Sequence, residues 1–212
     1  MPRVIAGAAG GRRLAVPPGT TTRPTSDRAR EGLFASVLSE LGDLRGKRVL
    51  DLYAGSGALG LEALSRGAES VLLVESDARA AAVIEANIAA VALPGAAVAI
   101  DRVERLLSPG GARGRYDLAL ADPPYAVTDA AVARMLTLLA DGWLVEDALV
   151  VVERATRSGP LDWPPGYLAG KSRRYGEATF WYGWYDSGAE AGEPQETGSR
   201  SALNAPHKAH EE

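Results

Sequence analysis

Hydrophobic and polar positions follow two different periods along residues 48–185. Short apolar runs rich in β-branched residues predict strands, and longer stretches rich in Ala and Leu between them predict helices. The predicted strands are Arg48–Tyr53, Ser70–Glu75, Ala97–Ile100, Asp117–Ala121, Ala148–Glu153 and Ala178–Tyr185, and the predicted helices are Ala58–Arg66, Ala78–Val91, Val103–Leu107 and Asp129–Leu139. This alternation predicts an α/β domain with a parallel sheet that helices cover on both faces.

The regions on either side of this alternation have their own patterns. Residues 1–25 are rich in Gly, Pro and Thr, with two short β-like runs, and they predict a hairpin followed by an extended arm. Ser26 is a suitable N-cap for a helix with one apolar stripe, which Gly42 ends. At the other end, the strand Ala178–Tyr185 follows a basic stretch and is expected to form a hairpin at the edge of the sheet.

We therefore expect three parts: an N-terminal hairpin and arm over 1–25, a domain over 26–186, and a tail over 187–212. The tail contains Gly, Pro, Ser, Glu and Gln but almost no large apolar residue, which predicts disorder. A chain of 212 residues is long enough for one α/β domain with a core of its own.

The lack of Cys and the position of the two His residues exclude whole classes of chemistry. The chain has no Cys, so it has no disulfides, no thiolate zinc site and no cysteine nucleophile. Its two His residues, His207 and His210, both lie in the tail, so the domain has no imidazole for general base or metal chemistry. A reaction here must use carboxylates, hydroxyls, backbone dipoles or a cofactor, and we expect no metal.

The charge is unevenly distributed. The net charge is −4, but residues 1–48 contain nine basic and four acidic residues and the tail is acidic. We expect Arg12, Arg13, Arg23, Arg28 and Arg30, together with Lys171, Arg173 and Arg174, to bind RNA. The alternative is that these side chains solvate the surface or pair with Asp27 and Glu31. No apolar stretch is long enough to span a membrane and no signal peptide is present, which predicts a soluble, cytoplasmic protein. We also expect a monomer.

A glycine-rich loop follows the first predicted strand. Gly55, Gly57 and Gly60 match the spacing G-x-G-x-x-G, and Glu75 ends the next strand 20 residues after Gly55. Glycines let the backbone approach a ligand closely, and an acidic residue at that strand end can accept both ribose hydroxyls. The loop therefore predicts a site for a nucleoside cofactor.

The identity of this cofactor follows from charge. A carboxylate beside the loop, Asp51, would repel the pyrophosphate of a dinucleotide but suits the ammonium and sulfonium groups of S-adenosylmethionine. Asp101 ends the third strand and is placed to reach the adenine, although it could equally serve as a helix N-cap. We expect S-adenosyl-L-methionine to be bound by Asp51, Tyr53, Ala54, Gly55, Ser56, Gly57, Glu75, Ser76, Asp101, Arg102 and Asp122.

A rigid corner, Asp122-Pro123-Pro124-Tyr125, follows the fourth strand. In an open parallel sheet it faces the same crevice as the glycine loop. Asp122 and the Pro123 carbonyl are acceptors for the two N–H groups of an exocyclic amine, and Tyr125 can stack on its ring. The alternative is an ordinary turn. We expect Asp122, Pro123, Pro124 and Tyr125 to be catalytic.

These motifs resemble class I S-adenosylmethionine-dependent methyltransferases that act on amines. More specifically, Arg3–Gly7, Gly11–Leu14, Thr22–Arg28, Arg30-Glu31, Leu33-Phe34 and Asp51–Ala68 resemble the bacterial 16S ribosomal RNA guanine-N2 methyltransferase family of the RsmD type. The resemblance implies a Rossmann-like, mostly parallel seven-stranded sheet with a small N-terminal hairpin and helix extension. It also implies methylation of the N2 amine of one guanine, 966 in the conventional scheme, of 16S ribosomal RNA in the 30S subunit or an assembly intermediate.

Three other functions remain open from the sequence. The corner suits any exocyclic amine, so an adenine-N6 methyltransferase acting on DNA or RNA is one. A catalytically silent RNA-binding assembly factor is another, although the intact glycine loop argues against it. A dehydrogenase that uses NAD is disfavoured because no His or Lys is placed to serve the hydride transfer.

Overall fold

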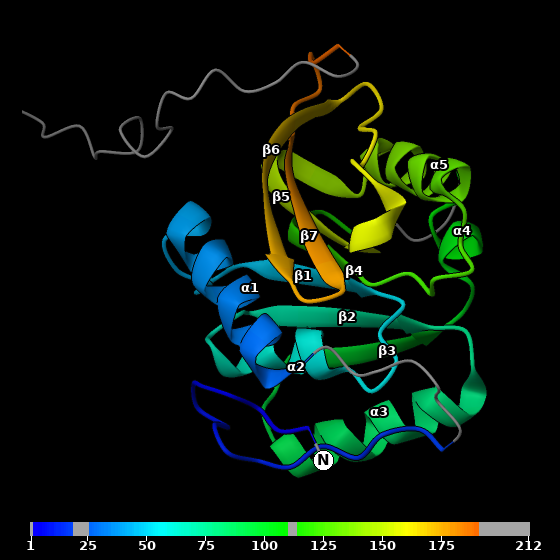
Figure 1. Ribbon diagram of the computed structural model, residues 1–212. Coiled ribbons are helices and arrows are strands. Elements are labelled where there is room, and N and C mark those ends of the chain that lie inside the picture. The colour runs from blue at the N-terminus through cyan, green and yellow to red at the C-terminus, as the bar shows by residue number, and fades with distance from the viewer. Residues whose placement is uncertain (1, 19–25, 110–113, 191–212) are drawn as a thin grey trace, which may run out of the picture.

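The computed structural model describes residues 2–18, 26–109 and 114–190, and it contains one seven-stranded sheet (Figure 1). The strands are β1 (Arg48–Leu52), β2 (Ser70–Glu75), β3 (Ala96–Ile100), β4 (Tyr116–Ala121), β5 (Leu144–Ala155), β6 (Tyr167–Tyr175) and β7 (Ala178–Tyr185). Their order is β3-β2-β1-β4-β5-β7-β6, in which β1 to β5 are parallel and β7 is antiparallel to both its neighbours. The predicted α/β class is confirmed.

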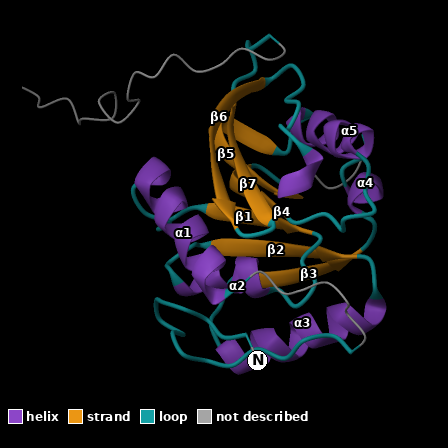
Figure 2. Ribbon diagram, in the orientation of Figure 1, coloured by secondary structure: helices purple, strands orange, loops and turns teal. Residues whose placement is uncertain are grey.

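Helices cover both faces of the sheet (Figure 2). They are α1 (Asp27–Leu41), α2 (Ala58–Ser65), α3 (Ala78–Val91), α4 (Val103–Leu106) and α5 (Asp129–Ala140), with a 3-10 turn at Thr156–Ser158. Helices α1, α2 and α3 pack on one face through Phe34, Ala63 and Ile84, and α4 and α5 pack on the other through Val103 and Leu136. Residues of a buried strand alternate between these two cores, as the continuous apolar runs predicted.

The last two strands form a hairpin at the edge of the sheet, as expected. Strand β7 lies between β5 and β6, so it is bonded on both sides and is not the edge of the sheet. The basic stretch before it belongs to β6, which is the edge strand. The aromatic residues of β7 explain this, because Phe180 and Tyr182 are buried in the core below α1 and need neighbours on both sides.

Helix α1 begins and ends where the sequence predicts. The Ser26 hydroxyl accepts a hydrogen bond from the Ala29 N–H at 3.2 Å, and Gly42 ends the helix with a positive φ of 78°. Within the described part of the chain, no helix is long and apolar enough to cross a membrane.

The N-terminal segment, residues 2–18, folds onto α2 and α3. Arg3 and Arg13 form an antiparallel bridge, although neither predicted β-like run becomes a strand. Its side chains Val4 and Leu14 are fully buried in a small core with residues of both helices. The buried Glu62 of α2 accepts hydrogen bonds from the backbone N–H groups of residues 5 and 6, at 2.6 and 3.1 Å, which fixes the segment to the domain.

The start of the expected tail also contacts the domain. The Ser187 N–H donates to the Glu146 carboxylate at 3.2 Å, and the Gly166 N–H donates to the Ala189 carbonyl at 2.9 Å. Residues 187–189 are therefore hydrogen-bonded to the domain. The prediction of disorder for the rest of the tail, residues 191–212, lies outside the described residues.

Candidate functional site

A cavity of about 530 Å³ opens at the carboxyl ends of the parallel strands. The loops after β1, β2, β3 and β4 line it, as the topology of an open parallel sheet requires. The expected cofactor residues at its wall are Asp51, Tyr53, Ala54, Gly55, Ser56, Glu75, Ser76, Asp101, Arg102 and Asp122, and Pro123, Pro124 and Tyr125 of the corner line it too. The two motifs found in the sequence therefore share one cavity.

The backbone of the glycine loop adopts left-handed conformations at two of its glycines. Gly55 and Gly57 have positive φ values of 57° and 77°, which glycine adopts without strain. Gly57 itself does not line the cavity but begins α2 as its N-cap. A side chain at Gly60 would come within 2.8 Å of Val71 in β2, so glycine there lets α2 pack closely on the sheet.

Asp51 is buried beneath this loop. It is 1% exposed, and its carboxylate accepts a hydrogen bond from the Gly60 N–H at 2.8 Å. Burial raises the pKa of Asp51 from 3.8 to about 7, with a further increase from the nearby charge of Glu75, while the Gly60 hydrogen bond acts in the opposite direction. A buried carboxylate held in this way favours a positively charged ligand group at the loop.

The loop orients Glu75 at the end of β2. Its two carboxylate oxygens accept hydrogen bonds from the Gly55 N–H at 2.9 Å and the Asp77 N–H at 2.8 Å. Each oxygen retains further acceptor capacity, and Glu75 lines the cavity. Glu75 can therefore accept hydrogen bonds from two neighbouring hydroxyls without changing its conformation.

Asp101 lines the cavity after β3, but its carboxylate has partners within the chain. It accepts hydrogen bonds from the Arg102 N–H and pairs with the Arg105 guanidinium, both at 2.6 Å. The N-cap of α4 is Arg102, without a side-chain hydrogen bond, so Asp101 is not the cap residue itself. On the same side, Tyr53 has a left-handed φ of 62° and its hydroxyl donates to Glu104 at 3.2 Å.

The Asp122–Tyr125 corner holds its side chains at different depths. Asp122 is partly buried, Pro123 is buried and Tyr125 is 50% exposed at the rim of the cavity. The Asp122 carboxylate accepts no hydrogen bond from any residue that the structure describes. Burial raises the pKa of Asp122 well above its ordinary value, and the negative charges of Glu153 and Asp51 raise it further.

The sequence analysis missed Glu153, a further acidic residue of this cavity. It lies near the end of β5, is 6% exposed, and lines the cavity beside the corner. A charged residue directly after the five apolar residues Ala148–Val152 was an available signal, because acids are rarely buried without a role or a partner.

Arg30 corrects an expectation. It is 1% exposed, so it cannot contact RNA at the surface. Its Nη2 donates to the Asp27 carboxylate at 2.6 Å and to the Arg3 carbonyl at 2.8 Å. Its Nε and Nη1 have no hydrogen-bond partner among the described residues, and the side chain lines the cavity. Arg30 therefore offers buried donors to a ligand.

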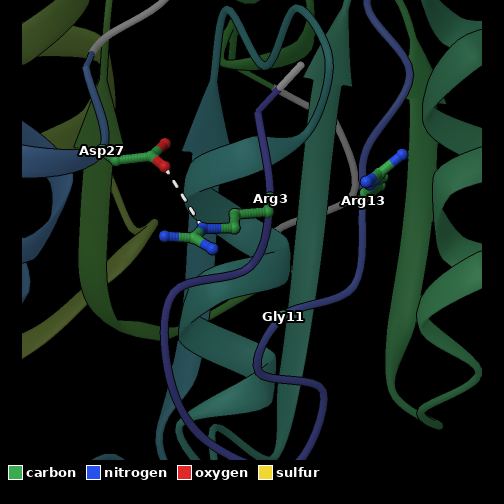
Figure 3. A pocket seen from close by; sticks show the side chains of 4 residues that line it. All are labelled: Arg3, Gly11, Arg13 and Asp27. Atoms are coloured by element: carbon green, nitrogen blue, oxygen red, sulfur yellow. Dashed lines mark ion pairs between the residues drawn. The ribbon is translucent and has the colours of Figure 1, made fainter.

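The remaining basic residues of the N-terminal group lie at the surface, except Arg23, which is outside the described residues. Arg12, Arg13 and Arg28 are exposed, although Arg12 also donates to the Ala90 carbonyl. Figure 3 shows a second hollow, of about 620 Å³, lined by Arg3, Gly11, Arg13 and Asp27. Arg3 pairs with Asp27 across it at 3.5 Å.

The second basic group lies on β6. Arg173 and Arg174 are exposed, and the Arg174 Nε donates to the Gly176 carbonyl. Lys171 pairs with Glu40 at 2.6 Å and lies over the ring of Tyr182, so its charge is already compensated. Two of the three residues of this group are thus available to a phosphate.

The strand order, the single antiparallel strand and a glycine-loop cavity at the carboxyl ends together define a class I methyltransferase. The chain matches the family described as Conserved hypothetical protein 95 over residues 2–184. It belongs to this family, the RsmD family of methyltransferases.

Individual relatives agree with this assignment. Ribosomal RNA small subunit methyltransferase D of Escherichia coli strain K12 is 36% identical over 166 residues, which cover 76% of this chain and 80% of the relative. The solved structure of the yhhF protein of Escherichia coli has a TM-score of 0.74 and 30% identity, covering 87% of this chain and 98% of that one.

A more distant solved structure shares the fold alone. Magnesium protoporphyrin IX methyltransferase of Synechocystis, with bound S-adenosylmethionine, has a TM-score of 0.60 at 13% identity, covering 75% of this chain and 79% of that one.

Proposed function

We propose that this protein transfers a methyl group from S-adenosylmethionine to the exocyclic N2 amine of a guanine in the 16S ribosomal RNA of the small subunit. The observation that carries the proposal is that the glycine loop, Glu75 and the Asp122–Tyr125 corner line one cavity. The names of the relatives support the RNA, and the resemblance described above supports the guanine.

The described residues fit the cofactor group by group. Glu75 would accept hydrogen bonds from the two ribose hydroxyls, and Asp51 would lie near the positively charged ammonium. The buried Arg30, with Nε and Nη1 free among the described residues, would donate to the carboxylate of the methionine portion. A dinucleotide fits less well, because Asp51 would face its pyrophosphate.

The Asp122–Tyr125 corner would supply hydrogen-bond acceptors and a base for the amine of guanine. S-adenosylmethionine supplies a methyl group on a positively charged sulfur, which becomes a neutral thioether when the N2–carbon bond forms. Asp122 and the Pro123 carbonyl would accept the two N2–H groups, which orients the nitrogen lone pair toward that methyl group. Asp122 would then take one of these protons, and its raised pKa makes it a stronger base for this step than an exposed carboxylate.

The exposed arginines would bind the RNA beside the cavity. The N-terminal segment carries Arg3, Arg12 and Arg13 on its surface and also lines the cavity through Pro2 and residues 16–18. A phosphate backbone bound along this segment would therefore bring a base to the rim, where Tyr125 is exposed and can stack on it.

The test is to incubate the purified protein and S-adenosylmethionine with unmethylated small-subunit particles, deproteinised ribosomal RNA and duplex DNA, and to map the product by nuclease digestion and mass spectrometry. N2-methylguanosine at one position of the ribosomal RNA is the expected product. N6-methyladenine in any of the three would replace the proposal by the adenine alternative. Failure to bind S-adenosylmethionine in calorimetry would favour the silent assembly factor.

A further inference from the structure

Asp122 and Glu153 lie side by side at the carboxyl ends of β4 and β5. Ala121 and Val152 are paired in register, so the residues that follow them are neighbours as well. Both side chains project from the face that packs against α1, because alternation along each strand places Val152 on the opposite face. The next residue, Arg154, pairs with Asp129 of α5 at 2.6 Å on that opposite face.

Glu153 is close to both recognition residues of the corner. Its charge contributes to the raised pKa of Asp122 and also to that of Tyr125. Asp51 is the other acid that acts on Asp122, and Asp122, Glu177 and Arg157 are the other charged groups that act on Tyr125. Glu153 therefore lies at the wall of the cavity, near both residues that would hold the base.

A second observation, independent of these acids, concerns hydrogen-bond donors at the wall of the cavity. Arg30 lines it with two buried donor groups that no described residue satisfies. Buried polar groups are normally hydrogen-bonded, so these two donors are available to a ligand in the cavity as far as the described residues are concerned.

We propose that Glu153 accepts a hydrogen bond from the N1–H of the guanine whose N2 amine Asp122 holds, and that it thereby selects guanine over adenine. This inference rests on the proposed function. Guanine presents N1–H and N2–H donors next to each other, which match two adjacent carboxylates. Adenine presents an unprotonated N1 next to its amine, so the N1 lone pair would face the Glu153 carboxylate and N1 could not donate a hydrogen bond to it.

The experiment uses small-subunit particles reconstituted with ribosomal RNA that carries either guanine or 2-aminopurine at the methylated position. 2-Aminopurine keeps the reactive amine but has an acceptor at N1. The ratio of kcat/KM for the two bases is measured for the wild type, for Glu153→Gln and for Glu146→Gln, the same substitution at an exposed position near the start of the strand.

We expect the wild type and Glu146→Gln to prefer guanine by about 100-fold or more, because the N1 of 2-aminopurine cannot donate to the Glu153 carboxylate and its lone pair faces that charge. In Glu153→Gln the amide can donate to the N1 of 2-aminopurine, and the preference is expected to fall by about 10-fold or more. A second variant, Glu153→Asp, keeps the charge and is expected to keep the preference at a lower kcat/KM. Melting temperatures and S-adenosylmethionine affinities verify that each variant is folded.

An unchanged preference in Glu153→Gln would overturn the role of Glu153 while leaving the guanine-N2 function intact. A wild type that methylates no guanine N2 would overturn both. If Glu153→Asp loses the preference for guanine as strongly as Glu153→Gln does, the side chain acts through its shape and not through its charge. That result would also overturn the inference.

Discussion

Asp51 provides the most quantitative prediction. Its carboxylate is 1% exposed, and its pKa in the folded protein is about 7 against an ordinary value of 3.8. The folded protein therefore binds a proton at Asp51 more tightly than the unfolded chain does. The stability that protonation contributes is fully present at low pH and decreases as the pH rises from about 4 to about 7.

The magnitude follows from these two pKa values. The contribution of Asp51 to the free energy of unfolding is expected to be about 2.5 kcal/mol lower at pH 8 than at pH 5. Asp51→Asn removes this dependence, because an amide does not ionise in this range. Its carbonyl oxygen can still accept the hydrogen bond from the Gly60 N–H, so the fold at the loop is retained.

The assay is urea unfolding of the wild type, Asp51→Asn and the control Asp162→Asn, a substitution at an exposed position, at several values between pH 5 and pH 8. The stability of Asp51→Asn relative to the wild type is expected to increase with pH by about 2–3 kcal/mol. A difference that is constant across this range would refute the raised pKa. The same substitution is expected to weaken S-adenosylmethionine binding, because it removes the charge that faces the ammonium.

Other substitutions separate cofactor binding, chemistry and RNA binding. Glu75→Gln is expected to weaken S-adenosylmethionine about 10- to 100-fold in calorimetry, since hydrogen bonds to a charged group contribute about 1.5–3 kcal/mol; an unaltered Kd would count against the ribose contact. Asp122→Asn is expected to lower single-turnover rates at least ~100-fold with cofactor affinity within a few fold, and unchanged rates would exclude Asp122 from the chemistry. Replacing Arg12 and Arg13 by Gln is expected to flatten the salt dependence of RNA binding by about two phosphate equivalents, whereas an equal slope would place the RNA elsewhere. Deleting residues 191–212 is expected to leave melting temperature and activity unchanged, and a large fall in either would contradict the composition-based prediction.

Local sequence signals predicted much of the fold and the centre of the site. The glycines of the loop, the acid at the end of β2 and the corner after β4 each follow a strand directly, so a parallel sheet brings them together whatever the details of packing. Their positions in one cavity needed only the correct order of elements. The cap at Ser26 is equally local, since it depends on the residues of one helical turn.

Contacts between distant segments could not be predicted in this way. Arg30 looks like one of several surface arginines in the sequence, but α1 packs on the sheet and buries it. Nothing local distinguishes it from Arg28, two residues earlier, which is exposed. Glu62 lies in the sequence like any polar residue of a helix, yet it is fully buried because the N-terminal segment covers it and donates to it. The place of β7 inside the sheet likewise depends on pairing across the whole domain.

One buried amide connects the N-terminal segment to the glycine loop. Asn87 of α3 is 2% exposed, and its Oδ1 accepts a hydrogen bond from the Ala15 N–H at 2.8 Å. Its Nδ2 donates to the Ala15 carbonyl at 3.0 Å and to the Ser56 carbonyl at 2.8 Å. Moving the N-terminal segment away from α3 would thus break hydrogen bonds of the same side chain that holds the glycine loop, at about 1 kcal/mol or more for each group left unsatisfied. The segment that carries Arg12 and Arg13 is therefore a structural part of the glycine-loop cavity and not an independent arm.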